Sequence, residues 1–385
     1  QPDLNWENPK VRQEIYKMVN WWLDKGLAGF RIDAIINIKK NLDFPMLEPD
    51  GLDGLAFCTK TLGTKDGVSE MLGELKRETF DKHGAFTVGE VFNITDDDLS
   101  DFIGENGYFS TIFDFSTELL SAGEHGWYDA PDVAFPAWKK AIFHAQDQAY
   151  SCGFESNIIE NHDEPRGVSR YLPVYARNSC GTKMLGTMSL LLRGLPFIFQ
   201  GQEIGMTNWQ SVDEFDDLNT VDQYHLALKA GLSEKDALDK IGRLSRDNAR
   251  TPMQWNTSFN AGFTTGIPWL RLNDNYPDVN VAAQEKDADS VLNYYKKLIA
   301  LRKSDTYKDI FTYGKTIPVF LEKEMLMAYC REKDDKRILV LGNFGEKKEA
   351  LLSAEPKKLL LSNMNRTEIG QDIILAPQES AVVLL

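Results

Sequence analysis

Short apolar runs alternate with segments of helical periodicity along the first half of the chain. Apolar residues recur every three or four positions over 9–26 and 67–82, which predicts two amphipathic helices. Runs rich in β-branched and other apolar residues predict strands at 29–34 and 85–90. Strands that alternate with helices are typical of βα units built around a parallel sheet.

The same alternation continues further along the chain. The next expected elements are a strand at 111–115, a helix at 136–150, a strand at 156–163, a helix at 183–192 and a strand at 195–200. A long polar stretch with one helical patch at 236–241 then precedes a helix at 290–304. The pattern therefore indicates an α/β fold with five strands.

After residue 305 the pattern changes to short apolar runs separated by charged turns. The expected strands lie at 316–321, 325–330, 337–343, 358–361 and 380–385. They predict a small antiparallel β domain over 306–385, next to an α/β domain over 1–305 that contains a long excursion at about 206–285. We expect the β domain to cover one side of the α/β domain.

Three of the predicted strands end in acidic residues. Arg31 and Asp33 lie two residues apart in a strand, so their side chains point to the same face. A neighbouring cation favours the charged form of an acid, which suits a nucleophile or a stabiliser, although a structural ion pair would look the same. Glu90 has no cation next to it in sequence, and Asp163 follows His162. Because catalytic groups in βα barrels come from the carboxyl ends of strands, we expect one shared site.

Other candidate residues have both a functional and a structural interpretation. His162 is either a site residue or a hydrogen-bonded core histidine. Arg246 and Arg250 lie four residues apart, so they share a face if the segment is helical, but a solvated basic pair would show the same spacing. Phe92 and Ala34, close behind the two candidate carboxylates, either border a substrate or pack in the core.

Several motifs, taken in order, resemble the signature regions of a known enzyme family. They are the opening Gln1-Pro2-Asp3-Leu4-Asn5, the run Gly29-Phe30-Arg31-Ile32-Asp33, the strand that ends at Glu90, the triplet Asn161-His162-Asp163, and the strings at 199–206 and 245–255. The family is the α-amylase family of glycoside hydrolases. The first and last of these motifs are similar to those of its oligo-1,6-glucosidase and α-glucosidase branch. The resemblance covers nearly the whole chain.

The resemblance implies a (β/α)8 TIM barrel followed by an antiparallel β domain. Residues 1–305 resemble its C-terminal five strands, about strand 4 to strand 8, so we expect an amino-terminally truncated chain whose first three barrel units lie upstream of Gln1. A five-strand piece would expose two strand edges and an apolar interior. We therefore expect the isolated chain neither to fold stably nor to act alone.

The resemblance also implies roles for the acidic residues. Asp33 corresponds to the nucleophile that forms a covalent glucosyl intermediate, and Glu90 to the acid that then acts as a base. Asp163 corresponds to the carboxylate that holds hydroxyl groups of the distorted sugar. Arg31 then supports the ionised form of Asp33, and His162 donates a hydrogen bond beside Asp163.

The remaining candidates become substrate contacts by the same resemblance. At least one of Arg246 and Arg250 is expected to contact the terminal sugar or to pair with an acid upstream of Gln1. Phe92 and Ala34 are expected to border the second sugar subsite. Valine after the nucleophile accompanies α-1,6 preference in this branch, so Ala34 favours α-1,4 or mixed specificity.

The implied function is a retaining, exo-acting α-glucosidase that removes glucose from short malto- or isomalto-oligosaccharides. Alternatives within the family are an oligo-1,6-glucosidase or dextran glucosidase with strict α-1,6 preference, a trehalose-6-phosphate hydrolase and a sucrose-isomerising glucosyltransferase. An alternative of another class is a non-catalytic barrel that serves as a binding or transporter-partner domain. Such relatives usually lack catalytic carboxylates, whereas all three candidates are present here.

Composition and charge narrow the range of partners. The net charge of −15 and the pI near 4.9 argue against nucleic acid and anionic membranes as partners, and suit a neutral ligand such as the oligosaccharide that the resemblance implies. The four cysteines, Cys58, Cys152, Cys180 and Cys330, show no metal-binding spacing, so we expect free thiols in a reducing cytoplasm.

The resemblance implies no organic cofactor, and the structural Ca²⁺ that the family allows would lie in a loop upstream of Gln1. No apolar run reaches the about eighteen residues of a membrane span. A monomer is expected, although the sequence leaves the oligomeric state open.

Overall fold

The chain divides into two units in its computed structural model. Gln1–Phe115 with Gln148–Ser156 forms the first unit, and Ser116–Asp147 with Asn157–Leu385 forms the second. The structure describes residues 3–43, 45–49, 54–56, 60, 67–92, 94–351 and 355–385. Gln1, Pro2 and Cys58, which the sequence analysis singled out, lie outside the described residues.

Helix α1 (Pro9–Asp24) opens the first unit and confirms the helix predicted at 9–26. Asn8 caps it by accepting a hydrogen bond from the Lys10 amide, and proline fits the first turn because no helical partner is needed there. Its buried residues are Tyr16, Val19 and Leu23. Their spacing of three and four residues forms one stripe, which packs into an apolar cluster that also contains residues of the next helix.

The segment predicted as one helix over 67–82 folds as three consecutive helical pieces. These are α2 (Val68–Leu75), the π-helical turn η3 (Lys76–Phe80) and α3 (Asp81–His83). The predicted apolar face is buried and consists of Val68, Met71, Leu72 and Leu75. Gly84 ends the helix in a left-handed conformation with φ 59°, which glycine adopts without the steric cost of a side chain.

Three parallel strands form the sheet of the first unit. In spatial order they are β1 (Gly29–Ile32), β2 (Phe86–Gly89) and β3 (Thr111–Ile112). β3 is shorter than the strand predicted at 111–115, and Phe113, just after β3, forms an isolated parallel bridge with Ser156. The helical turns η4 (Asp96–Asp98) and α4 (Leu99–Phe102) lie between β2 and β3 in the chain. Because all three strands run the same way, their carboxyl ends share one edge of the sheet.

Short strands and longer helices continue the alternating pattern. The elements that follow are η5 (Glu118–Ser121), η6 (Trp127–Asp129), α5 (Phe135–Cys152), β4 (Ser156–Asn157), α6 (Gly167–Tyr171), η7 (Val174–Ala176), α7 (Ser179–Leu190) and β5 (Leu195–Pro196). β4 pairs with β5, and the Phe197 amide donates to the Asn157 carbonyl. Both strands are much shorter than predicted. β5 is limited because Pro196 has no amide hydrogen to donate to a sheet. β4 ends before His162 and Asp163, which lie in a turn beyond it.

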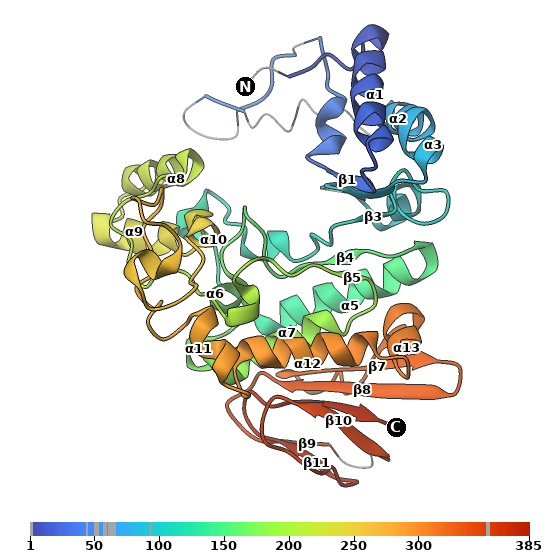
Figure 1. Cartoon of the computed structure of the whole chain (residues 1–385). Helices are drawn as coiled ribbons and strands as arrows, with labels where there is room; N and C mark the ends of the chain where they lie inside the picture. The colour runs from blue at the N-terminus through green and yellow to red at the C-terminus, as the bar shows by residue number, and fades with distance from the viewer. Residues whose placement is uncertain are drawn as a thin grey trace. The chain divides into compact units, whose positions relative to one another are not determined.

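Helices α7 and α12 (Val291–Lys303) pack together beside the large antiparallel sheet (Figure 1). They correspond to the helices predicted at 183–192 and 290–304. α7 begins earlier than predicted because the Asn178 side chain accepts hydrogen bonds from two amides of its first turn. The buried cluster between these helices and the sheet includes Met184, Met188, Tyr295, Leu298, Tyr329 and Val340.

The polar excursion holds more helix than the sequence pattern indicated. α9 (Glu234–Gly242) confirms the predicted patch at 236–241. The turn η8 (Gln202–Ile204) precedes this stretch, whose other helical elements are α8 (Leu218–Lys229), α10 (Asp247–Arg250), η9 (Phe259–Gly262) and α11 (Val281–Lys286). The buried residues that join α8 to α9 are Ala227, Ala237 and Ile241. Since the residue that α8 buries in this contact is Ala227, the apolar face of α8 gives only a weak signal in the sequence.

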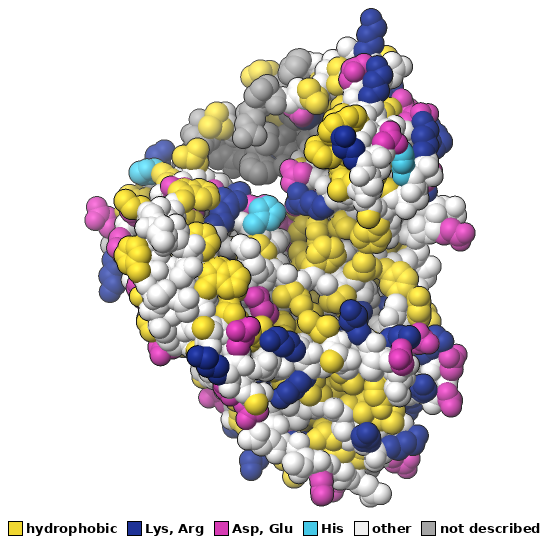
Figure 2. Space-filling model, in the orientation of Figure 1, with side chains coloured by type: hydrophobic (Ala, Val, Ile, Leu, Met, Phe, Trp, Pro, Cys, Tyr) yellow, Lys and Arg dark blue, Asp and Glu magenta, His cyan; other side chains and the backbone are white. Residues whose placement is uncertain are grey.

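The chain after residue 314 forms the antiparallel sheets that the sequence predicted (Figure 1). One sheet has five strands in the order β10-β12-β8-β7-β6, and a second sheet pairs β11 with β9. The strands are β6 (Lys315–Pro318), β7 (Leu326–Lys333), β8 (Lys336–Asn343), β9 (Glu349–Leu351), β10 (Lys358–Ser362), β11 (Ile373–Leu375) and β12 (Ser380–Leu384), and helix α13 (Lys308–Tyr313) precedes them. Acidic and basic side chains are interspersed over the surface of this part (Figure 2). The domain boundary near residue 305 stays a prediction.

Candidate active site

The register of the first sheet places Asp33 and Glu90 at the same end of neighbouring strands. Ile32 of β1 pairs with Gly89 of β2, and each carboxylate residue directly follows one member of that pair. The Glu90 amide donates to the Ile32 carbonyl at 3.0 Å, so the pairing extends to the acid itself. Local strand pairing therefore brings together two residues that are far apart in sequence.

Arg31 connects the two carboxylates. One of its terminal nitrogens contacts Asp33 Oδ1, and the other lies 2.6 Å from Glu90 Oε1. The Ala34 amide donates a hydrogen bond of 2.8 Å to Glu90 Oε2. The Asp33 side chain is 76% exposed, whereas that of Glu90 is 10% exposed. The two acids therefore share a cation but differ strongly in their access to water.

This difference in burial affects the protonation of Glu90. Burial raises the pKa of Glu90, the Ala34 amide and the Arg31 guanidinium lower it, and Asp33 raises it again, so that the net shift is upward. A carboxyl group with a raised pKa keeps its proton to higher pH, as a general acid requires. The sequence showed no cation beside Glu90. The structure adds a cation that the local sequence could not show, because Arg31 reaches Glu90 from the neighbouring strand.

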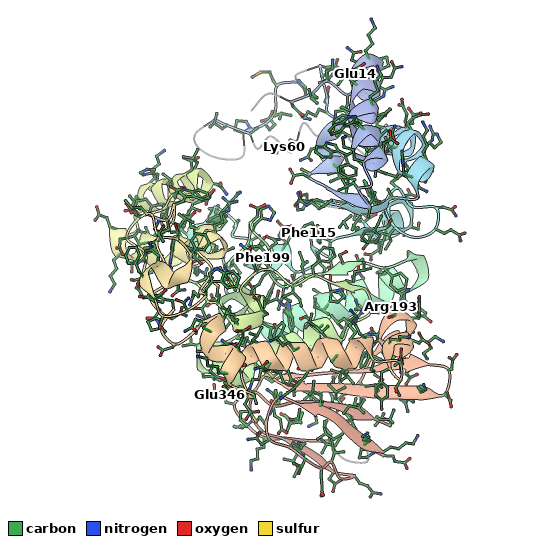
Figure 3. All side chains as sticks on the ribbon, viewed as in Figure 1. Glu14, Lys60, Phe115, Arg193, Phe199 and Glu346 are labelled. Carbon is green, nitrogen blue, oxygen red and sulfur yellow. The ribbon has the colours of Figure 1, made fainter. Side chains whose placement is uncertain are left out.

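Ala34 and Phe92 follow the two carboxylates closely in the chain. Ala34 has a left-handed backbone conformation (φ 39°, ψ 37°), which is uncommon for a residue with a side chain, and it precedes the turn η1 (Ile35–Ile38). Phe92 stacks on Phe115, which is labelled in Figure 3, with ring centroids 4.6 Å apart. The segment after Glu90 thus presents an aromatic pair, which the sequence had shown only in part because Phe115 was not among the candidates.

His162 and Asp163 lie in the second unit, in the turn after β4. Asn161 Oδ1 accepts a hydrogen bond of 2.7 Å from the Asp163 amide, an arrangement that stabilises the turn. His162 Nε2 lies 3.1 Å from Asp163 Oδ2. The His162 side chain is 52% exposed, which rules out the alternative of a histidine packed in the core.

Arg246 and Arg250 both contact Asp163. Arg246 directly precedes the short helix α10 and Arg250 is its last residue, so the two side chains share a face. Arg246 Nη1 is 3.1 Å and Arg250 Nη2 is 2.6 Å from Asp163 Oδ1. Arg250 Nε also donates to the His162 carbonyl at 2.9 Å. The alternative of a solvated basic pair is therefore wrong, because both cations are engaged by one carboxylate.

Asp217 is a member of this cluster that the sequence analysis did not single out. Its Oδ1 lies 3.3 Å from Arg246 Nε and 3.9 Å from Arg250 Nη1. Its Oδ2 accepts a hydrogen bond from the Thr220 amide, so Asp217 also caps α8. The sequence signal at Asp217 is that of a helix cap, and such a signal does not reveal which cations lie nearby.

The candidate residues thus form one cluster in each unit. The first cluster consists of Arg31, Asp33, Ala34 and Glu90, with Phe92 nearby in the chain. The second consists of His162, Asp163, Arg246 and Arg250, with Asp217 added.

The structure also bears on metals, thiols and membranes. Within the described ranges, no group of three or more His, Cys, Asp and Glu residues is arranged to hold a metal ion. Cys152, Cys180 and Cys330 are free cysteines. Of the helices that the structure describes, none is long and apolar enough to cross a membrane.

Comparison with known proteins decides the family. Residues 1–314 match the family model of the alpha amylase catalytic domain. The chain belongs to the α-amylase family. It is 38% identical to the probable oligo-1,6-glucosidase 3 of Bacillus subtilis over 397 residues, which cover 100% of this chain and 70% of that protein. This similarity confirms the branch that the sequence motifs indicated.

Solved structures of α-amylase family members are similar in fold. A trehalose-6-phosphate hydrolase of Bacillus licheniformis has a TM-score of 0.86 and 33% identity, covering 99% of this chain and 69% of that chain. An isomaltulose synthase of Klebsiella sp. LX3 has a TM-score of 0.88 and 30% identity, covering 100% and 70%. These relatives imply a TIM barrel with a C-terminal antiparallel domain, and the five-stranded sheet fits that domain. Which barrel strands the chain contains stays a prediction.

Proposed function

We propose that this α-amylase family protein is a retaining, exo-acting α-glucosidase that removes terminal glucose from short malto- or isomalto-oligosaccharides. The observation that carries the proposal is the pair of carboxylates bridged by Arg31, one exposed and one buried with a raised pKa. Glycoside hydrolysis requires two carboxyl groups in different protonation states. The geometry of the first cluster supports this requirement.

In the proposed mechanism, Asp33 attacks the anomeric carbon of the terminal glucose. Glu90 donates its proton to the glycosidic oxygen as the bond to the leaving sugar breaks, and a glucosyl ester of Asp33 remains. Ionised Glu90 then takes a proton from water, which attacks the same carbon and releases glucose and free Asp33. Two inversions at one carbon retain its configuration. Arg31 supports ionised Asp33 at the start of the cycle and ionised Glu90 in its middle.

The second cluster is proposed to hold the terminal sugar. Two guanidinium groups hold the Asp163 side chain in place, and its oxygens can accept hydrogen bonds from sugar hydroxyl groups. His162 and at least one of the two arginines would donate hydrogen bonds to the same sugar. The proposal requires both clusters to act on one glucose unit.

The second sugar subsite is proposed to lie beside Ala34 and Phe92. The stacked rings of Phe92 and Phe115 offer an apolar surface of the kind on which sugar rings pack. The small side chain of Ala34 supports α-1,4 or mixed linkage specificity rather than strict α-1,6 specificity. A change of one small side chain alters discrimination by only about 1–3 kcal/mol, so the linkage preference rests on the smallest energy difference in the proposal.

The relatives named above define the alternatives. The chain is similar to an oligo-1,6-glucosidase, a trehalose-6-phosphate hydrolase and an isomaltulose synthase, so strict α-1,6 hydrolysis, cleavage of a phosphorylated disaccharide and isomerisation of sucrose are the rival activities. Chromatography of the products separates them, since they yield glucose, glucose 6-phosphate or an isomerised disaccharide. A non-catalytic binding protein would leave an aryl α-glucoside uncleaved. We further propose a cytoplasmic monomer without organic cofactor.

The test uses the intact natural protein with maltose, isomaltose, sucrose and an aryl α-glucoside. We expect release of glucose, and we expect Asp33→Asn to lower kcat by at least about 10³-fold because the nucleophile is lost. Asp24→Asn, which replaces an exposed carboxylate at the end of α1, serves as the matched control and should stay near the wild-type rate. Substantial turnover by Asp33→Asn would disprove the role assigned to Asp33.

A further inference from the structure

Arg166 is a buried guanidinium that joins three segments around the second cluster. Its side chain is 1% exposed. Nη1 lies 3.2 Å from Glu160 Oε2 and donates to the Gln200 carbonyl at 2.7 Å. Nε and Nη2 donate to the carbonyls of Asn248 and Ala249 at 3.3 and 3.2 Å. One side chain thus connects the segment before the His162 turn, the segment after β5 and helix α10.

The surroundings of Arg166 fix the orientation of its guanidinium group. The ring of Phe199, labelled in Figure 3, lies 5.2 Å from the guanidinium carbon. Gly201 has φ +92°, and a Cβ built there would lie 3.1 Å from Arg166 Nη1 and 2.4 Å from Met206 Sδ. The backbone is also held, because the Arg166 amide donates to Asn208 Oδ1 at 2.9 Å. A side chain so closely packed has little freedom to redirect its donors.

Helix α10 depends on contacts of this kind. It has four residues, which is far too short for a helix to be stable by itself. The two carbonyls that Arg166 binds belong to Asn248 and Ala249, which lie between Arg246 and Arg250 in the chain. Any movement of those carbonyls would therefore move both arginines relative to Asp163.

We infer that Arg166 is a positioning residue, which holds α10 in the orientation that lets Arg246 and Arg250 contact Asp163 together. The inference rests on the proposed function in assigning this cluster to the terminal sugar. A guanidinium suits the task because its planar fork presents several donors in fixed directions, whereas the ammonium group of lysine acts as a point charge. Glu160 compensates the buried cation, which would otherwise be costly to bury.

The first test measures kcat/KM of Arg166→Lys in the intact natural protein with an aryl α-glucoside. We expect a loss of roughly 10–100-fold, the size of effect that a displacement of about 1 Å at a site produces. In an Arg250→Ala background, the same replacement should cost less than about 3-fold, because part of what Arg166 positions is already gone. Additive losses in the double variant would overturn the inference.

Arg331→Lys is the matched control. Arg331 is fully buried and donates to the carbonyls of Leu191, Phe311 and Gly314. It therefore matches Arg166 in burial and in its bonds to backbone carbonyls, whereas Arg166 also contacts the Glu160 carboxylate. None of the acceptors of Arg331 belongs to α10. Arg331→Lys should lose stability while its kcat/KM stays within about 2-fold of the wild type. That result would show that the loss of activity in Arg166→Lys comes from the position of α10 and not from the removal of any buried guanidinium.

A second readout does not require activity. Hydrogen–deuterium exchange of the peptide that covers 246–251 should become faster in Arg166→Lys and stay unchanged in Arg331→Lys. If Arg166→Lys does not fold, the double variant Glu160→Gln/Arg166→Gln replaces it, because removing both charges leaves no unpaired ion in the core. Unchanged exchange at α10 would overturn the inference. If the wild type does not cleave the aryl glucoside, the proposed function is contradicted. The exchange measurement would still test whether Arg166 holds α10.

Discussion

At the scale of single residues, burial and not Arg31 determines how the two carboxylates of the first cluster differ. Arg31 contacts both acids, yet Glu90 keeps a raised pKa because burial outweighs the lowering effect of the cation. The pairing of Arg31 with Asp33 was predictable, since residues two apart in a strand share a face. The contact with Glu90 was not, because it depends on the register between two strands that are separated by a long segment.

This contact leads to a prediction about pH. Arg31 lowers the pKa of Glu90, so Arg31→Gln should raise that pKa and keep the general acid protonated to higher pH. The alkaline limb of the pH profile of kcat/KM should move upward, in addition to an overall loss of rate. The measurement is that profile for both proteins with an aryl α-glucoside. A limb that stays in place or moves to lower pH would show that Arg31 does not act on the proton of Glu90.

The buried Glu160 gives a second prediction about pH, this time for stability. Burial raises the pKa of Glu160 from 4.5 to about 7, while Arg166 and Gly167 lower it. Because the folded pKa is raised, the contribution of Glu160 to stability is fully present below about pH 4.5 and is lost as pH rises through about 7. The free energy of unfolding of the wild type should therefore fall relative to Glu160→Gln by up to about 3 kcal/mol over this window.

Urea unfolding of the two proteins at several pH values measures this difference. Glu160→Gln cannot ionise, so the other titrating groups, common to both proteins, cancel in the comparison. Parallel curves for the two proteins would show that Glu160 does not change its protonation between the folded and unfolded states in this range.

At the scale of elements, the sequence predicted the helices with clear apolar stripes and the longer antiparallel strands. α1, α9 and α12 follow their predicted ranges closely because their buried residues recur at helical spacing. β9 and β11 escaped prediction because three residues are too few to show an alternating pattern. α8 escaped it because the one residue that it buries fully in the cluster with α9 is an alanine, Ala227.

The close packing of β2 yields a prediction about Gly89, the residue before Glu90. A Cβ built at Gly89 would lie 2.6 Å from the ring of Phe109, which is buried. Gly89→Ala should therefore destabilise the protein by about 1–3 kcal/mol and, by displacing the end of β2, lower kcat/KM. Thermal unfolding and kinetics measure the two effects.

Gly73→Ala provides the control for Gly89→Ala. A Cβ at Gly73 meets the flexible end of Arg77 at 3.2 Å, and alanine favours the helix in which this residue lies by up to about 1 kcal/mol. Stability should be unchanged or higher, with normal activity. Equal effects of the two replacements would mean that the contact with Phe109 is not the cause.

At the scale of the whole molecule, the antiparallel domain shares its core with the helices that precede it. Tyr329 of β7 is fully buried, and its hydroxyl donates to the Met188 carbonyl of α7 at 3.0 Å. Tyr329 packs in one cluster with residues of α7 and α12. The sequence predicted a C-terminal β domain but could not reveal this continuity, because contacts between distant segments leave no periodic signal.

This shared core predicts that the helices and the sheet unfold together. Tyr329→Ala should destabilise the helices and the sheet together, by about 3–5 kcal/mol. Far-ultraviolet circular dichroism and tryptophan fluorescence should both report one unfolding transition, shifted by the same amount. The control, Ile374→Ala, replaces a side chain that is 51% exposed and should change stability by less than about 0.5 kcal/mol. Two separate transitions, of which only one responds to Tyr329→Ala, would contradict the shared core.

The account depends most on the claim that Asp33, Glu90 and Asp163 act on the same glucose unit. The direct measurement is a crystal structure of the intact natural protein after reaction with an activated fluoro-glucosyl fluoride, which traps the glucosyl ester of a retaining enzyme. We predict a bond from the anomeric carbon to the Asp33 carboxylate, Glu90 beside that carbon and Asp163 at the hydroxyl groups of the same ring. A sugar attached to another residue, or a ring that Asp163 does not touch, would contradict the account.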